Sequence, residues 1–321
     1  MNRRYKAYFY LLTTALIWGI ASPVIKNTLQ YIDPFSFLFW RFLIVSIILL
    51  PIYFIYTHKK KIHLTNKKVL KLSALGLLGT TFGLGLLFVG YKYTTAIDGS
   101  LIYSVSPIFV IIGGALLLKE KVTKMEKLGA LVAFIGSIVT IIQPVLEGKA
   151  FALENIGGNI LILFSAISWA AYCLLVRKFE YKDKDKTDPF VLTSIGFFAG
   201  LFTVIPIFLY ENVALNNYLK SVFMPTQALF HLNVQALPGI IYMSIFSSIV
   251  AFLTYNLGYS LIEASEATIF DYVKPVFTAP IAVLWLGEKI TLPFLTGAAL
   301  IFLGIFLTEF KSKKLRKVTK S

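Results

Sequence analysis

Hydrophobic residues fill the chain in long runs that short polar segments separate. Ten of these runs approach the roughly 20 residues that an α-helix needs to cross a hydrocarbon core of about 30 Å. We expect them at about 7–28, 35–57, 69–91, 97–118, 125–145, 155–177, 189–210, 236–259, 265–286 and 291–310. The pattern predicts an all-α integral membrane protein with ten transmembrane helices. The longest gap, 211–235, has room only for a short lid or an amphipathic segment.

The second half of the chain repeats the first half at an offset of 168 residues. The matched positions are Gly90-Tyr91 and Gly258-Tyr259, Pro107 and Pro275, Phe109 and Phe277, Glu120-Lys121 and Glu288-Lys289, Gly129-Ala130 and Gly297-Ala298, and Gly136 and Gly304. Nearer the start, Trp18 returns as Trp169, and Asp33-Pro34-Phe35 returns as Asp188-Pro189-Phe190. An Asp before a proline predicts a helix start, because Asp caps free amides and proline fits the first turn.

Each copy of the repeat holds five predicted spans. The copies cover 7–145 and 155–310, and a basic tail follows at 311–321. Because five is odd, the second copy must enter the membrane from the opposite face. The sequence therefore predicts two inverted five-helix repeats, an arrangement in which two halves rock around a central site in secondary transporters.

Charged residues are few and unevenly placed. They make up 15% of the chain, whereas soluble domains carry about 25%. The net charge of +15 suggests a nucleic-acid partner, but the lysines and arginines gather near the N-terminus and at 59–71, 119–127, 177–186 and 311–320. These segments alternate across the predicted spans, so the bias puts both termini and the loops near 60, 122 and 182 in the cytoplasm, and the loops near 150 and 220 outside. We expect a lipid bilayer and no nucleic acid as partner, and leave a homo-oligomer open.

A mid-span proline, a Leu-x-Glu-Lys turn and a Gly-rich span recur in both halves. They read Pro107…Leu118-Lys119-Glu120-Lys121…Gly129…Gly136 and Pro275…Leu286-Gly287-Glu288-Lys289…Gly297…Gly304. This pattern resembles the EamA domains of the drug/metabolite transporter superfamily over nearly the whole chain, with Lys119 where the commoner pattern has Gly. The resemblance implies a ten-helix carrier of the inner (cytoplasmic) membrane with a central substrate cavity. Members move amino acids, nucleobases, vitamins and other small metabolites, often outward.

A polar stripe runs along the fourth and ninth spans at helical spacing. Its residues are Ser100, Tyr103 and Ser106, and in the second copy Thr268, Asp271 and Lys274. Each stripe ends at a proline, Pro107 or Pro275, that frees backbone carbonyls near mid-membrane and provides a hinge. Asp271 and Lys274 can pair, which offsets an insertion cost of roughly 2.5–3.5 kcal/mol for a lone charge. We expect this pair to bind substrate or couple protons; a purely structural ion pair is the alternative.

Further residues are candidates for the cavity or for helix ends. The cavity candidates are Trp18, Trp169, Tyr172, Tyr255, Asn256 and Tyr259. Arg41 either holds a substrate carboxylate or, as we favour, snorkels to the outer headgroups. The same two interpretations remain open for Lys26. The carboxylates Glu120, Glu288, Asp98 and Glu266 are expected to cap helices or order loops, with gating as the alternative. Gly76, Gly79, Gly83 and Gly85 permit close helix packing in the third span.

The function that this sequence favours is secondary transport of small polar or amphipathic metabolites, such as amino acids or related compounds. We expect alternating access and export. A membrane enzyme acting on a lipid or isoprenoid is the alternative; it needs clustered Asp, Glu or His, which the sequence lacks. A scaffold or sensor would usually attach a soluble output domain, and a primary pump would need a phosphate-binding Gly-x-x-x-x-Gly-Lys-Ser/Thr motif. One cysteine, Cys173, and histidines in predicted loops, His58, His63 and His231, predict no metal or cofactor.

Overall fold

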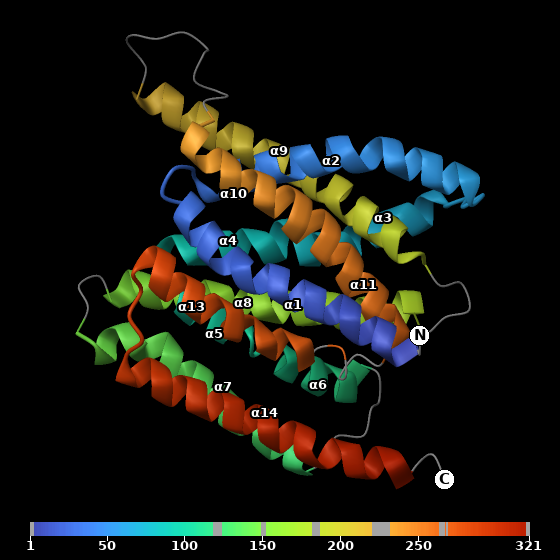
Figure 1. Cartoon of the computed structure of the whole chain (residues 1–321). Helices are drawn as coiled ribbons and strands as arrows, with labels where there is room; N and C mark the ends of the chain where they lie inside the picture. The colour runs from blue at the N-terminus through green and yellow to red at the C-terminus, as the bar shows by residue number, and fades with distance from the viewer. Residues whose placement is uncertain are drawn as a thin grey trace.

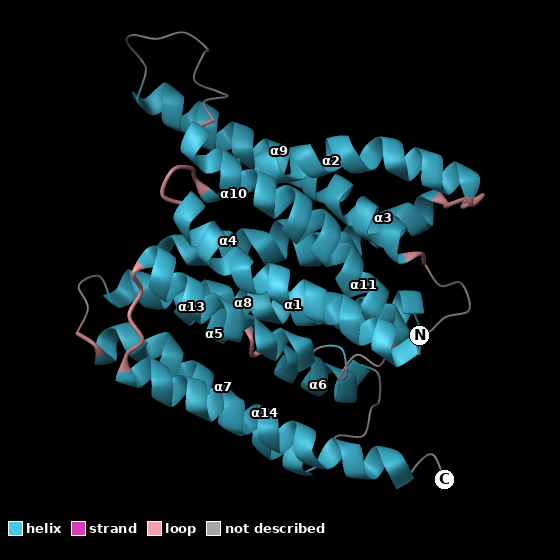
Figure 2. Ribbon diagram, in the orientation of Figure 1, coloured by secondary structure: helices cyan, strands magenta, loops and turns pink. Residues whose placement is uncertain are grey.

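The computed structural model describes residues 3–117, 124–148, 152–181, 187–219, 232–262, 267 and 269–318, and these form helices and connecting loops without a strand (Figure 2). Eight helical stretches among them are long and apolar enough to cross a membrane, and Leu292–Gly304 is a shorter apolar helix. The protein is therefore an all-helical, multi-pass membrane protein. Glu120, Glu266, Thr268, His231 and the loops near 122, 150 and 220 lie outside the described residues, as does most of the loop near 182.

The helices follow the predicted apolar runs along the chain (Figure 1). The first half comprises α1 (Arg3–Thr28), α2 (Pro34–Lys59), α3 (Asn66–Leu77), the π-helical turn η1 (Leu78–Phe82), α4 (Gly83–Tyr93), α5 (Ala96–Tyr103), α6 (Ser106–Leu117) and α7 (Lys124–Leu146). The second half comprises α8 (Ala152–Val176), the π-helical turn η2 (Arg177–Tyr181), α9 (Pro189–Leu219), η4 (Val234–Ala236), α10 (Leu237–Tyr242), the π-helical turn η5 (Met243–Val250), α11 (Ala251–Leu261), η6 (Ile269–Val273), α13 (Lys274–Leu286) and α14 (Leu292–Val318).

Three segments are more helical than the sequence predicts. α14 continues to Val318, so it takes in most of the predicted tail, and α9 continues to Leu219, into the predicted gap. His58 lies in the last turn of α2 and not in a loop. In each case no proline or glycine stands at the predicted boundary, so helical hydrogen bonding continues past the end of the apolar run.

The two Asp-Pro-Phe sequences start helices, but only one aspartate caps. Pro34 opens α2, yet the Asp33 side chain makes no cap hydrogen bond and instead pairs with Lys92 at 2.8 Å. The expected cap at Asp33 is thus wrong, because the ion pair takes its carboxylate. Asp188 Oδ1 does accept from the Phe190 amide at 2.9 Å, as expected.

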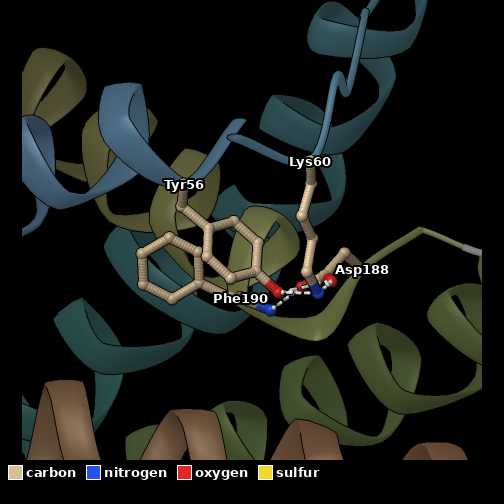
Figure 3. A network of polar contacts seen from close by, with 4 residues as sticks. All are labelled: Tyr56, Lys60, Asp188 and Phe190. Carbon is tan, nitrogen blue, oxygen red and sulfur yellow. Dashed lines mark hydrogen bonds and ion pairs between the residues drawn. The ribbon is translucent and has the colours of Figure 1, made fainter. Parts of the chain in front are cut away.

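Asp188 also joins α9 to the end of α2 (Figure 3). Its Oδ2 accepts from the Tyr56 hydroxyl at 2.7 Å and from Lys60 Nζ at 3.3 Å. The hydrogen bonds to Tyr56 and Asp188 raise the pKa of Lys60. A raised lysine pKa means that the contact is fully formed below about pH 10.5 and is lost only above it, so it persists throughout the physiological range.

Matching helices of the two halves pack against each other in opposite directions. α7 and α14 lie side by side, with Gly136 against Gly297 and Gly129 against Gly304 (Figure 1). In α2 and α9, Phe39 stacks on Phe208 at 4.0 Å, while Tyr56, near the far end of α2, meets Phe190 at the start of α9. Both pairs are therefore antiparallel. The start of α1 and the end of α14 lie at the same end of the bundle (Figure 1).

Two charged side chains bind the exposed backbone groups of helix ends. Glu288 accepts from the amides of Ala96 at 2.6 Å and Ile97 at 2.9 Å, so it caps α5, a helix of the other half. The capping hypothesis for Glu288 is thereby confirmed. Gly287 ahead of it has a φ of 66°, a left-handed conformation that favours glycine. Lys26 Nζ donates to the carbonyls of Tyr91 at 3.0 Å and Lys92 at 3.3 Å, at the C-terminal end of α4.

Candidate functional site

A cavity of about 60 Å³ lies in the middle of the bundle, where helices of both halves converge. It is lined by Trp18, Ala21, Ser22 and Ile25 of α1, Arg41 of α2, Leu84, Leu87 and Tyr91 of α4, Ser100 and Tyr103 of α5, Trp169 of α8, Met243 and Ser247 of η5, Phe252 of α11 and Lys274 of α13. Pockets for drug-sized ligands measure about 300–1,000 Å³. This cavity therefore has room for a few water molecules and is smaller than such pockets.

Asp271 and Lys274 form the expected ion pair beside the cavity. Lys274 Nζ lies 2.7 Å from Asp271 Oδ1, and their side chains are 7% and 3% exposed. The ammonium also lies 4.4 Å from the ring centroid of Trp18 and 5.2 Å from that of Tyr103, within the range of cation–π attraction. One oxygen of this buried carboxylate, Asp271 Oδ2, has no hydrogen-bond partner within the described part of the chain. Asp271 itself lies behind Lys274 rather than on the cavity wall.

Both polar stripes lie where a membrane-spanning segment is interrupted. α5 ends at Tyr103, and α6 begins at Ser106, directly before Pro107. In the second half, the 3₁₀ turn η6 carries Asp271 and gives way to α13 at Lys274, directly before Pro275. The side chains of Ser100 and Thr278 join the two interrupted segments at 3.0 Å. Many secondary transporters bind their substrate at such discontinuous helices near the middle of the membrane.

Aromatic rings form one wall of the cavity. Trp18 and Trp169, which match in the repeat, meet edge to face at 5.3 Å, and Phe252 contacts both. The indole Nε1 of Trp18 donates to the carbonyl of Ser247 at 3.1 Å, which fixes its ring against η5. The wall is largely apolar, so it suits the hydrocarbon or aromatic part of a small ligand.

Five of the predicted residues are on the cavity wall and several lie behind it. Trp18, Ser100, Tyr103, Trp169 and Lys274 line the cavity. Four others connect α8, α9 and α11: Tyr172 donates to Asn256 Oδ1 at 3.3 Å, Asn256 Nδ2 donates to Thr193 Oγ1 at 2.9 Å, the Tyr255 hydroxyl lies 3.1 Å from Cys173 Sγ, and Tyr259 donates to the Cys173 carbonyl at 3.0 Å. Ser106 is fully buried away from the wall. These residues support the helices that carry the cavity.

Arg41 is the largest departure from the sequence prediction. It was expected to snorkel to the outer headgroups, but it is only 1% exposed and lines the cavity. Its Nε donates to Ser248 Oγ at 2.7 Å and its Nη2 to Ser247 Oγ at 3.4 Å. The serines of η5 draw the guanidinium inward, because they supply the acceptors that headgroups would otherwise supply. Sequence reasoning missed Ser247, and the run Ser244, Ser247, Ser248 in an apolar span was the available signal.

The two halves contribute matching polar contacts around the cavity. Ser165 Oγ donates to the Gly83 carbonyl at 2.7 Å, and its counterpart Thr14 donates to the Ala251 carbonyl at 3.2 Å. Each bond crosses from one half to the other at a π-helical turn, η1 or η5. No group of three or more His, Cys, Asp and Glu placed to hold a metal ion occurs in the part of the chain that the structure describes.

The sequence matches the EamA-like transporter family over residues 5–142 and 156–310, once in each half. The chain belongs to this family. Among similar proteins, an uncharacterized transporter of Bacillus subtilis (strain 168), YyaM, is 30% identical over 93% of this chain and 92% of its own length. An uncharacterized transporter of Archaeoglobus fulgidus is 27% identical over 95% of this chain and 98% of its own. A solved crystal structure superposes with a TM-score of 0.63 at 18% identity, covering 98% of this chain and 99% of that one, which shows a shared fold.

The family and the names of these relatives point to a multi-pass membrane transporter rather than to an enzyme. Its partners are accordingly a lipid bilayer and a small-molecule substrate. The central cavity, with its ion pair, buried arginine and aromatic wall, is the candidate site for that substrate.

Proposed function

We propose that the protein is a secondary transporter of small polar or amphipathic metabolites, such as amino acids or related compounds, which works by alternating access and exports its substrate. The observation that carries the proposal is the small cavity in the middle of the bundle, where two spans are broken and where polar and charged groups meet an apolar wall. Its volume of about 60 Å³ supports a cycle in which the cavity must open to load and to release substrate.

We propose ten spans arranged as two inverted repeats, 7–145 and 155–310. The antiparallel contacts of α2 with α9 and of α7 with α14 support inversion, because equivalent helices of a parallel repeat would run the same way. The matched bonds of Ser165 and Thr14 support a two-fold relation between the halves. Rocking of such halves about the cavity would expose it to either face.

We propose that the protein lies in the inner (cytoplasmic) membrane with both termini in the cytoplasm. The basic segments near 60 and at the C-terminal end support this orientation. Single cysteines at Lys60 and Lys289, placed in a Cys173→Ser background, test it. We expect a membrane-impermeant maleimide added to intact cells to label position 289 and to spare position 60 until the cells are opened. Labelling of position 60 in intact cells contradicts the orientation.

We propose that Asp271, paired with Lys274, couples substrate movement to a proton. Its buried carboxylate has one oxygen without a hydrogen-bond partner among the described residues, beside the cavity and at a helix break. Buried ionisable residues within membrane spans commonly form proton relays and substrate paths. Asp271 would release its proton when Lys274 is close and take it up when substrate or helix movement separates the pair.

Flux through purified protein in liposomes tests the proposed function. Uptake of a panel of radiolabelled amino acids, nucleobases and vitamins is measured with and without an imposed pH gradient. We expect one chemical class to accumulate, and to accumulate more when the gradient is present. Uptake no faster than in protein-free liposomes across the whole panel contradicts the proposal.

A further inference from the structure

Arg41 presents an uncompensated positive charge to the central cavity. Its guanidinium is buried and donates hydrogen bonds to the hydroxyls of Ser247 and Ser248. It also lies 5.5 Å from the ring centroid of Phe88, while its Nη1 has no hydrogen-bond partner among the described residues. Lys274, the other cation on the wall, is neutralised by Asp271 at 2.7 Å. Across the described residues, no carboxylate pairs with Arg41. A desolvated cation in a membrane span is unfavourable unless an anion joins it.

The repeat shows that the fold does not require an arginine at this place. Asp33 and Asp188, and likewise Pro51 and Pro206, stand 155 residues apart, and the same offset matches Arg41 with Gly196. At Gly196, α9 packs directly against Gly76 of α3, and a Cβ added at Gly76 would collide with the Gly196 backbone. Gly76 matches Ser244 at the 168-residue offset. One of these two junctions between the halves is therefore closed by two glycines, whereas the matching junction holds a guanidinium and a serine.

The surrounding backbone is shaped to orient that guanidinium. Ser248 Oγ donates to the Met243 carbonyl five residues earlier at 2.8 Å, so its lone pairs remain to accept from Arg41 Nε. Ser244 Oγ donates to the Arg41 carbonyl at 3.3 Å, which ties α2 to η5. π-helical turns of this kind are frequent at functional sites. With Nε and Nη2 held by serines, Nη1 is left for a ligand in the cavity.

We propose that Arg41 binds the carboxylate of the transported substrate, so that the protein selects small organic acids, including zwitterionic amino acids, over neutral and cationic analogues. A planar guanidinium matches a carboxylate in geometry as well as charge. The aromatic wall of Trp18, Trp169 and Phe252 would contact the rest of the molecule. The inference rests on the proposed transport function and narrows its substrate class.

Ligand binding to purified full-length protein tests the inference without knowledge of the natural substrate. Thermal unfolding in detergent is followed with the free amino acids and their 2-oxo acid analogues, and with the corresponding amino-acid amides, which keep the side chain and ammonium but lack the carboxylate. We expect at least one acid to raise the melting temperature of the wild-type protein in a saturable way, and its amide to have no effect. Equal stabilisation by acid and amide, or no binding by any acid, overturns the inference.

Three variants assign the preference to Arg41. We expect Arg41→Gln to raise the dissociation constant of the acid at least tenfold. Arg41→Lys keeps the charge but loses the planar pair of guanidinium N–H donors, so we expect it to raise the dissociation constant less and to keep the preference for the acid. The control is Arg177→Gln, because Arg177 Nη1 donates to the Tyr259 carbonyl at 3.3 Å and is absent from the cavity wall; it should bind like wild type. Unchanged affinity in Arg41→Gln overturns the inference, and if that variant does not fold, unchanged affinity in Arg41→Lys does so.

The same compounds in liposomes separate this inference from the proposed function. Transport of amides as fast as acids leaves the transporter proposal intact and overturns the role of Arg41. Saturable binding of acids that Arg41→Gln abolishes, without flux of any acid, supports the role of Arg41 and contradicts transport of this class.

Discussion

The ammonium of Lys274 is stabilised by one carboxylate and two aromatic rings. Asp271 lies 2.7 Å away, and the rings of Trp18 and Tyr103 lie within 4.4 and 5.2 Å of it. Removing one member of a buried ion pair typically destabilises a protein by about 3–5 kcal/mol, because the other charge stays buried. Here the rings retain part of the stabilisation when the carboxylate is lost, so a neutral residue at 271 is expected to be tolerated.

We therefore expect Asp271→Asn to remain folded and to continue substrate exchange, but to lose accumulation driven by a pH gradient by at least tenfold. The amide keeps the shape of the side chain and cannot release a proton. Counterflow and gradient-driven uptake in liposomes measure the two activities separately. The double variant Asp271→Asn with Lys274→Met provides the control. Normal gradient-driven transport by that double variant would assign the pair a purely structural role.

Interrupted helices require partners for their free ends, and the two halves supply these for each other. Glu288, in the turn between α13 and α14, binds the first amides of α5, the segment that carries Ser100 and Tyr103 to the cavity. A carboxylate at a helix N-terminus is favoured by both the hydrogen bonds and the helix dipole. The turn of one half therefore fixes the position of a cavity helix of the other.

Replacing Glu288 by Gln is expected to lower the stability of the protein by about 1 kcal/mol, since it removes the charge and one acceptor from the α5 terminus. The thermal unfolding midpoint in detergent measures the change. Lys289→Gln is the matched control, because Lys289 is exposed in the same turn. A midpoint for Glu288→Gln equal to that of the control would show that the cap does not stabilise α5.

The contact of α7 with α14 depends on glycine at the crossing. A Cβ added at Gly136 would lie 2.8 Å from the Gly297 carbonyl oxygen and from the Ile301 amide, and neither backbone group can rotate away. Gly136→Ala is therefore expected to destabilise the protein by about 1–3 kcal/mol through overpacking. Gly157→Ala, where no atom lies within 4 Å, should be neutral or slightly stabilising. Equal melting temperatures for the two variants would contradict the close packing.

At the scale of the whole molecule, the sequence predicted the features that depend on spacing along the chain. It did not predict those that depend on contacts between distant segments. Apolar run length located the helices, and the stripe spacing located the Asp271–Lys274 pair. Arg41 was misplaced because its position depends on the serines of η5, about 200 residues away in the chain, which periodicity does not register. Likewise, the sequence predicted four further residues to line the cavity: Tyr172, Tyr255, Asn256 and Tyr259. Whether such side chains face the cavity or a neighbouring helix depends on three-dimensional packing.

The whole molecule is proposed to expose one cavity to both sides of the membrane in turn, and cysteine accessibility at Ser22 measures this. Ser22 lines the cavity and is 8% exposed. In a Cys173→Ser background, Ser22→Cys is treated with an impermeant anionic methanethiosulfonate from outside intact cells, and separately from the cytoplasmic face of inverted vesicles. We predict labelling from both sides, slowed by transported substrate. Labelling from one side only, or from neither, would contradict alternating access through this cavity.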